Sequence, residues 1–209
     1  MSNPKNIAVF VSGHGTNLQA LINDQQEGLI NGKIAVVISN KVDAFALERA
    51  KTAGIQGVFI NPKSQPSDIE YDKQIAEVLA SYNIDLVVLA GWLRILTDEI
   101  LVPYHNRIVN IHPSLLPAFG GHGMYGLKVH KAALDYGVRY SGATAHFVDG
   151  DVDGGAIIDQ AVVKVDYDDT PETLHSKVIH EEHRLLTKVV RAYCDNKIWV
   201  NGRHVMIKD

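Results

Sequence analysis

NIAVFVSGHGTN, residues 6–17, joins a compact apolar run to a glycine-rich turn, and a helical pattern follows directly. The apolar run at 6–11 predicts a core strand. Leu18, Leu21 and Ile22 then recur at the spacing that places side chains on one face of a helix. The chain therefore begins in the order strand, glycine-rich turn, helix.

The same alternation of strand and helix continues through the first half of the chain. Apolar runs predict further strands at 33–39, 56–60, 85–90 and 107–111, and helical patterns lie at 44–53, 68–82 and near 97–102. Continuous apolar strands separated by helices are typical of a parallel sheet that is covered on both faces. We therefore expect an α/β fold with a mostly parallel, doubly wound (Rossmann-like) sheet.

The second half of the chain has a different pattern. Longer strands are predicted at 141–148 and 156–165, as an antiparallel pair. A long helix follows to about Tyr193, with Thr170 as its N-cap and Pro171 at its first position. Asn201-Gly202, between two short apolar runs, predicts a terminal hairpin. Since no repeat or linker interrupts the sequence, we expect one domain over 1–209, with this antiparallel extension and long helix at its C-terminal end.

Composition narrows the class of protein. The 209 residues suffice for one α/β domain, and the formal net charge of −4 gives no reason to expect nucleic-acid binding. Cys194 is the only cysteine, so no internal disulfide can form and a reducing cytoplasm is the simplest setting. The first apolar run is too short for a signal peptide, and no stretch has the length of a membrane span. We expect a cytoplasmic protein that does not bind membranes.

The glycine-rich turn at 12–17 suits an anion. Backbone amides at a helix start bind phosphate, and glycines allow the chain to approach it closely. A dinucleotide fold is the obvious competitor, but Leu18 occupies the third glycine position of its fingerprint and Asn40 stands where an acidic residue would hold a ribose. The turn therefore favours a single phosphate. The alternative is a tight structural turn in which Thr16 or Asn17 caps the helix.

Asn110 and His112 lie two residues apart at the end of a predicted strand, so their side chains share one face. Open α/β sheets bind their ligands at this carboxyl end. An amide donor beside an imidazole suits a carbonyl oxygen that becomes an oxyanion, and histidine exchanges protons near neutral pH. The alternative is a buried polar pair that the backbone satisfies.

Two further segments carry clustered ionisable residues. The turn DGDVDGG, 149–155, is either a solvated hairpin tip or the source of a carboxylate that orients His112 and favours its charged form. It lacks the calcium-loop pattern. His180 and His183 flank two glutamates on the long helix, but their spacing differs from that of the HExxH zinc motif and favours a solvated helix face.

Four segments together resemble one family. SGHGTNLQA at 12–20, AGWLRIL at 90–96, NIHPSLLP at 110–117 and GATAHFVDGDVDGG at 142–155 are similar to the corresponding segments of the folate-dependent formyltransferases. The NxHxSLLP core with a downstream aspartate is common to that family. The loop at 12–20 resembles specifically its phosphoribosylglycinamide formyltransferase members.

The resemblance implies roles for individual residues. The catalytic set would be Asn110, His112 and Asp153, with His146 beside it in a supporting position. The phosphorylated acceptor would be bound by Gly15, Thr16, Asn17 and Glu182. The folate pocket would be lined by Leu93, Arg94, Ile95 and Leu96, together with Asp149, Gly150, Asp151 and Val152.

The reaction that the resemblance implies is transfer of the formyl group of 10-formyltetrahydrofolate to the amine of glycinamide ribonucleotide, in purine biosynthesis. Both substrates are small molecules and no metal is required. Asp153 would keep His112 protonated, which predicts a pKa of His112 above about 6.5. Two departures from the family concern the shape of the segment after Pro117, at 118–129, and Asp68, which stands where members often place a basic residue near the folate tail.

Three other functions remain open at this point. A formyltetrahydrofolate hydrolase would share the Asn-His-Asp set but is expected to carry an N-terminal regulatory domain. A methionyl-tRNA formyltransferase would need an additional domain and a basic surface for RNA. A folate- or nucleotide-binding module without activity would not need Asn110, His112 and Asp153 together. The oligomeric state does not follow from the sequence.

Overall fold

The computed structural model of the chain describes residues 4–208. Its strands are β1 (Lys5–Val11), β2 (Gly32–Ser39), β3 (Gln56–Phe59), β4 (Leu86–Leu89), β5 (Ile108–His112), β6 (Tyr140–Phe147), β7 (Ile157–Lys164), β8 (Ile198–Asn201) and β9 (His204–Ile207). Its helices are α1 (Thr16–Gln26), α2 (Phe45–Thr52), α3 (Asp68–Ser81), α4 (Asp98–Leu101), α5 (Leu127–Tyr136) and α6 (Pro171–Cys194), with a 3₁₀ turn at η1 (Pro62–Ser64). The bounds expected from the sequence agree with these to within a few residues.

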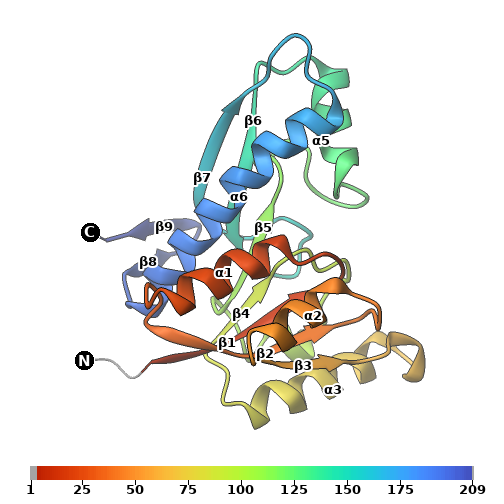
Figure 1. Cartoon of the computed structure of the whole chain (residues 1–209), viewed down its shortest axis with the longest axis vertical. Coiled ribbons are helices and arrows are strands. Elements are labelled where there is room, and N and C mark those ends of the chain that lie inside the picture. Colours follow the sequence, from red (N-terminus) through yellow and green to blue (C-terminus); the bar gives the residue numbers. More distant parts are fainter. Residues whose placement is uncertain (1–3, 209) are drawn as a thin grey trace.

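Seven strands form one sheet in the order β3-β2-β1-β4-β5-β6-β7, and β8 and β9 form a separate hairpin (Figure 1). The strands from β3 to β5 pair in parallel, whereas β5–β6 and β6–β7 pair antiparallel. The mostly parallel Rossmann-like sheet with an antiparallel extension is therefore confirmed. Chain order reverses between β1 and β4, which is the position where open α/β sheets bind ligands.

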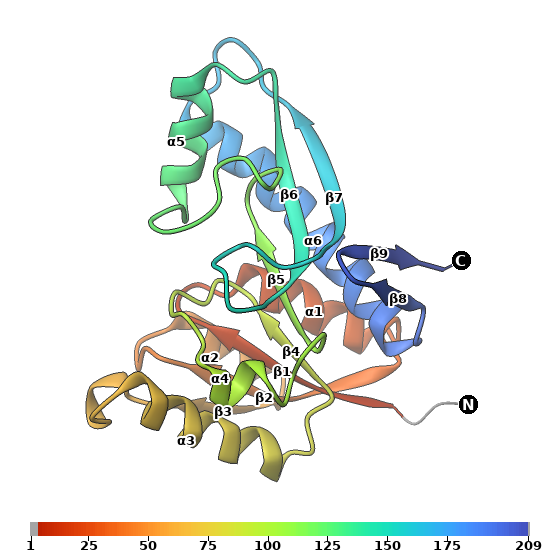
Figure 2. The same cartoon turned by 180° about the vertical axis from the view of Figure 1, so that it is seen from behind.

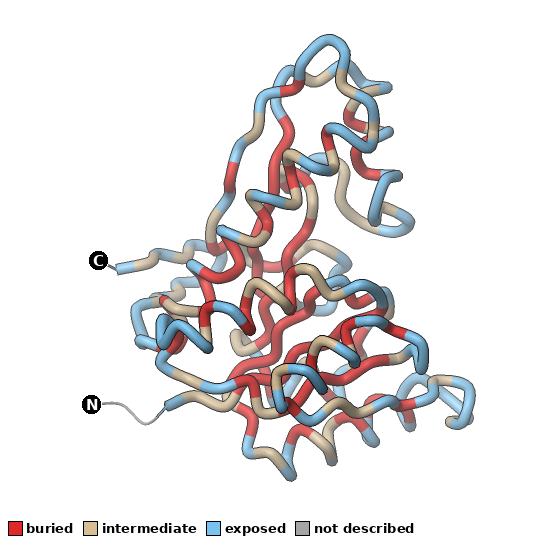
Figure 3. Tube along the Cα trace, viewed as in Figure 1, coloured by how far each residue is buried: buried red, intermediate tan, exposed pale blue. Residues whose placement is uncertain are grey.

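Helices cover both faces of the sheet. Alternate residues of β1 enter two different cores, with Ile7 and Val9 on one face and Ala8 and Phe10 on the other. The first face is covered by α1, α2, α5 and α6, and the second by α3 and α4, as the views from the two sides show (Figures 1 and 2). Because both faces are covered, the central strands are buried along almost their whole length (Figure 3). This explains why their sequences are continuous apolar runs.

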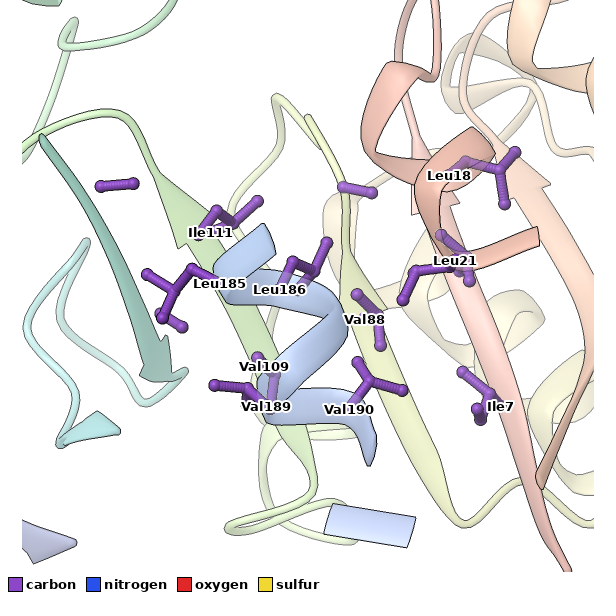
Figure 4. Close-up of a cluster of buried hydrophobic side chains, with 14 of the residues drawn as sticks. Ile7, Leu18, Leu21, Val88, Val109, Ile111, Leu185, Leu186, Val189 and Val190 are labelled. Carbon is purple, nitrogen blue, oxygen red and sulfur yellow. The ribbon is translucent and has the colours of Figure 1, made fainter. Parts of the chain in front are cut away.

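Helix α6 provides the largest single contribution to the first core. Leu185, Leu186, Val189 and Val190 lie over Val109 and Ile111 of β5 (Figure 4). Burial of each such side chain is worth about 1.5–3 kcal/mol, which offsets the entropy of ordering a long helix. The helix starts as expected at Thr170, whose hydroxyl accepts from the Thr173 amide (3.3 Å), while the Thr173 hydroxyl accepts from the Thr170 amide (2.8 Å). The predicted N-cap is confirmed.

Helix α5 was not among the elements expected from the sequence, which left 118–129 without an assigned structure. It begins at Leu127, buries Val129, His130 and Ala133, and ends at Gly137 in the left-handed conformation (φ 80°). The spacing of these apolar residues and the glycine after the last helical residue are both typical of a helix. The four glycines that precede Leu127 favoured a loop and hid this pattern. With β6, β7 and the start of α6, α5 forms the part that projects beyond the parallel strands of the sheet (Figures 1 and 2).

Candidate active site

The loops after β1, β4 and β5 meet at the carboxyl edge of the sheet and enclose a cavity of about 390 Å³. A second cavity of about 100 Å³ shares Trp92, Ile95, Asn110 and Asp153 with it. The two cavities are lined by most of the candidate residues predicted from the sequence, namely Asn17, Leu93, Arg94, Ile95, Leu96, Asn110, His112, His146, Asp149, Gly150, Asp151, Val152, Asp153 and Glu182. Gly15 and Thr16 do not line either cavity.

Asn110 and His146 face each other across the β5–β6 ladder, where they are direct antiparallel partners. The Asn110 side-chain amide lies 3.0 Å from His146 Nε2, and His146 Nδ1 lies 2.8 Å from the Phe147 carbonyl. Since the carbonyl requires Nδ1 to donate, the neutral ring of His146 accepts from Asn110 at Nε2. His146 therefore fixes the orientation of the Asn110 amide. A second contact from this amide to Asp153 Oδ1, at 3.5 Å, is long enough to leave one donor hydrogen available.

His112 is buried between two acceptors. Its Nε2 lies 2.9 Å from the Phe119 carbonyl, and its Nδ1 lies 3.4 Å from Asp153 Oδ2. The neutral ring donates from Nε2, so Nδ1 is the atom that takes up a proton, and it does so facing the carboxylate. Burial is the largest effect on this group and lowers the pKa of His112, although Asp153 and the Phe119 carbonyl both act to raise it. The expectation of a raised pKa was wrong for the unliganded chain, because desolvation outweighs the ion pair.

Asp153 lies at the centre of the cluster in a left-handed backbone conformation (φ 56°), which is uncommon for a residue other than glycine. Its Oδ2 accepts from the Gly121 amide (2.9 Å), and its Oδ1 lies 3.6 Å from His146 Nε2. Burial alone would raise the pKa of Asp153, but His112 and the Gly121 amide hold that pKa below its usual range. The group is therefore a carboxylate at neutral pH.

Asn17 and Glu182 connect the glycine-rich turn to α6. The Asn17 side-chain amide donates to Glu182 Oε2 at 2.8 Å, although the two residues are far apart in the sequence. Burial raises the pKa of Glu182 to about 7, and the hydrogen bond from Asn17 opposes this effect. The N-cap of α1 is Gly15, with no side-chain cap bond, so the alternative of a capping Thr16 or Asn17 was wrong. The solvated helix face expected at 180–183 was also wrong for Glu182, which is buried against the cavity.

The segment 93–96 provides an apolar wall. Leu93 and Ile95 are 51% and 57% exposed, unusually high for large apolar side chains that line a cavity, whereas Leu96 is buried. The Arg94 guanidinium binds Asp68 and lies over the Tyr71 ring. Asp68 therefore has a cationic partner within the chain.

Several residues of the site were not recognised from the sequence. Gly121 lines the larger cavity, and its backbone amide binds Asp153. Phe119 lines neither cavity, but its backbone carbonyl binds His112. Because both bonds come from the backbone, the only signal in the sequence was the glycine pair at 120–121. Trp92 packs on Phe10 with ring centroids 5.1 Å apart and lines both cavities. Its buried indole Nε1 has no hydrogen-bond partner among residues 4–208. His175, from α6, completes the wall.

Neither a metal site nor a membrane span is found among residues 4–208. No three His, Cys, Asp or Glu side chains in this part of the chain are grouped so that they could hold a metal ion. No helix in it combines the length and apolar character that crossing a bilayer would require. The cluster of Asn110, His112, His146 and Asp153 offers hydrogen bonding and proton exchange by an amide, two imidazoles and a carboxylate.

Comparison with known proteins defines the class to which this fold and cavity belong. The sequence profile of the family described as formyl transferase matches residues 5–190, and the chain belongs to this family. A glycinamide ribonucleotide transformylase from Symbiobacterium toebii superposes with a TM-score of 0.95 at 42% identity, covering all of this chain and 96% of that one.

Two relatives carry the name phosphoribosylglycinamide formyltransferase. The chloroplastic protein of Arabidopsis thaliana is 45% identical over 93% of this chain, which spans 67% of that protein. The Escherichia coli protein is 37% identical over 96% of this chain, which spans 95% of that protein.

Proposed function

We propose that this formyl transferase is a phosphoribosylglycinamide formyltransferase, which transfers the formyl group of 10-formyltetrahydrofolate to the amine of glycinamide ribonucleotide. The observation that carries the proposal is the convergence of Asn110, His112 and Asp153 in one cavity of a formyl transferase fold. Relatives with that name, and the glycine-rich loop at 12–20, support this choice of acceptor.

The two substrates occupy different parts of the cavity in this proposal. The folate ring system lies against the apolar wall of Leu93, Ile95 and Leu96 and against the loop at 149–152. The exposed apolar side chains of this wall gain burial when a flat heterocycle covers them. The acceptor lies against the hydrogen-bonded pair of Asn17 and Glu182, with its phosphate near the amides at 15–17.

The reaction needs one new bond, one broken bond and one relayed proton. The neutral amine of the acceptor, whose pKa is about 8 for an α-amino group, attacks the formyl carbon. Negative charge develops on the formyl oxygen, to which the Asn110 amide donates a hydrogen bond that is typically worth about 3 kcal/mol in the transition state. The protonated His112 ring adds a second donor, because the 3.4 Å contact of its Nδ1 with Asp153 is long enough for this N–H to be shared with the formyl oxygen. Collapse breaks the bond between carbon and the folate nitrogen. The amine loses a proton and the folate nitrogen gains one, through the His112–Asp153 pair.

The lowered pKa of His112 is compatible with this mechanism. In the unliganded chain the ring is mostly neutral at pH 7, and its proton-accepting Nδ1 faces Asp153. An oxyanion beside the ring adds a second negative charge and therefore favours protonation in the transition state, where it is needed.

The same proposal implies the domain organisation, the binding partners and the location of the protein. One domain over residues 1–209 would bind two small molecules, without nucleic acid, membrane or metal. A cytoplasmic location agrees with the buried free thiol of Cys194, which a reducing compartment keeps intact.

The test is a formyl-transfer assay with 10-formyltetrahydrofolate and glycinamide ribonucleotide, run beside a reaction that contains water as the only acceptor. We expect transfer that depends on the ribonucleotide, with slow hydrolysis in its absence. Equal rates of donor loss with and without the ribonucleotide would identify a hydrolase instead. Donor binding without any turnover would identify a binding module.

A further inference from the structure

Arg49, on α2, contacts the glycine-rich turn from behind. Its Nε donates to the His14 carbonyl (2.8 Å), its Nη1 donates to Gln19 Oε1 (3.0 Å), and its guanidinium lies 4.9 Å from the centre of the Phe45 ring. The side chain is half-buried and lines neither of the two cavities of the candidate active site. It therefore acts on the turn rather than on a ligand directly.

Helix α2 donates hydrogen bonds to two successive carbonyls of the turn. The Gly13 carbonyl accepts from the Ala46 amide (3.2 Å), and the next carbonyl, that of His14, accepts from Arg49. In a trans peptide the C=O and the following N–H point to opposite sides. With both carbonyls directed at α2, the amides of His14 and Gly15 are both directed away from it.

These two amides are available to a ligand. Within the described residues neither the His14 amide nor the Gly15 amide donates a hydrogen bond. The turn packs closely on α2, since a Cβ on Gly15 would lie only 2.6 Å from Ala46 Cβ. Parallel backbone donors at the start of a helix are an anion site, and α1 begins directly after Gly15.

We propose that Arg49 is a positioning residue for the phosphate of the acceptor. Through the His14 carbonyl it holds the Gly15 amide in the orientation that a phosphate requires, beside the His14 amide that the Ala46–Gly13 bond orients in the same way. The charge of Arg49 also favours the anion from behind the turn. The inference rests on the proposed function, since it assigns the phosphate of that acceptor to these amides.

Arg107 provides a matched control. Its guanidinium also donates to backbone carbonyls, those of Asp85 (2.8 Å) and Ile84 (2.6 Å), and lies 4.7 Å from the centre of the Tyr104 ring. The two arginines thus make the same kind of contacts, but Arg107 precedes β5 at the opposite edge of the sheet from the cavity. Loss of either should affect folding similarly, whereas only Arg49 should affect the acceptor.

The experiment compares Arg49→Met, Arg49→Lys and Arg107→Met in steady-state kinetics and thermal unfolding. We expect Arg49→Met to raise the KM for glycinamide ribonucleotide about tenfold or more, as loss of a hydrogen bond from a charged group predicts. The donor KM and kcat at saturating acceptor should not change. Arg49→Lys, which keeps the charge and a donor, should recover part of the loss, and Arg107→Met should leave the acceptor KM at the wild-type value.

A second measurement does not depend on activity. Titration with inorganic phosphate should shift the ¹⁵N–¹H resonances of His14 and Gly15 in the wild type, and these shifts should be lost in Arg49→Met. Equal acceptor KM in the Arg49→Met and Arg107→Met proteins, or phosphate shifts that persist without Arg49, would overturn the inference. A wild type that does not formylate the ribonucleotide but shows the phosphate shifts would instead overturn the proposed function. If Arg49→Met does not fold, Arg49→Lys carries both measurements.

Discussion

At the scale of single residues, burial and charge act in opposite directions on the ionisable groups of the cavity. For Asp153 the neighbouring donors outweigh burial, and for His112 burial outweighs the carboxylate. Among residues 4–208 Glu182 has one side-chain donor, Asn17, and the effect of burial on its pKa is larger than that of this hydrogen bond. The protonation state of each group is therefore set by how many partners the fold supplies.

Asp153→Asn should lower the pKa of His112 below its already depressed value, because it removes the nearest opposing charge. We expect kcat to fall on the order of 10²–10³-fold while acceptor binding changes little, since the charge acts mainly in the transition state. Removing both His112 and Asp153 should reduce the transition-state stabilisation much less than the sum of the two single losses, because the pair acts as one unit. NMR titration of His112 measures the change in its pKa. Kinetics of the single and double variants measure the fall in kcat, the acceptor binding and the departure from additivity.

Asp135→Asn is the control, because this exposed carboxylate is paired with Lys131 on α5. It should change neither the His112 titration nor kcat. Additive rate losses together with an unchanged His112 pKa would show that Asp153 acts only in shaping the 149–155 loop.

Glu182→Gln should stabilise the protein above pH 7. The pKa of Glu182 is about 7 in the fold, against 4.5 as its ordinary value, so the folded chain binds the extra proton between these two values. Wild-type stability therefore falls as pH rises through this window. The Gln variant keeps an acceptor for the Asn17 amide. It does not lose stability in this pH window, and the stability that the wild type loses there is worth up to about 3 kcal/mol. Urea unfolding of both proteins at pH 4.5, 6 and 8 should show a difference that grows with pH, and a constant difference would contradict the assignment.

At the scale of elements, the turn between β1 and α1 has two glycines with different constraints. Gly15 has φ 70° and meets Ala46, so any side chain there strains the backbone as well as altering the anion site. Gly13 is exposed, and a Cβ built on it meets nothing within 4 Å. A substitution at Gly13 therefore tests charge without disturbing packing.

Gly13→Asp should raise the acceptor KM by roughly 10- to 100-fold, because a carboxylate a few ångströms from the phosphate repels it. The donor KM should remain at the wild-type value. Gly13→Ala, which adds only the Cβ, should have the wild-type KM for the acceptor and for the donor. Equal losses for acceptor and donor would mean that the turn is structural and does not bind the phosphate.

At the scale of the whole molecule, the sheet brings loops from β1, β4 and β5 to one edge, and the β6–β7 hairpin returns Asp153 to them. Every group that the proposed reaction uses is then an amide, imidazole or carboxylate held by protein atoms. Activity should accordingly survive exhaustive treatment with a chelator. The measurement is formyl transfer before and after dialysis against EDTA, and complete loss restored by zinc or magnesium would contradict the mechanism.

The elements of the main sheet could be predicted because their signals are local. Runs such as 7–11 and 86–90 are apolar throughout since both faces of their strands are buried. That Asn110 and His112 share a face follows from strand geometry alone. The family motifs added Asp153 and Glu182 as candidates, which no local pattern would have paired with Asn110 and Asn17. Helix α5 escaped prediction because its pattern begins within a glycine-rich segment.

By itself the sequence determined the α/β fold, the order of its elements apart from α5, the family and the set of candidate residues. Only the tertiary structure decided how these residues interact: that the backbone of Phe119 and Gly121 faces His112 and Asp153, that Asn17 meets Glu182, and that Arg49 holds the turn. It also reversed the expected direction of the His112 pKa. The physical reason is that burial and backbone contacts between distant segments depend on packing, and packing leaves no pattern in the neighbouring residues of the sequence.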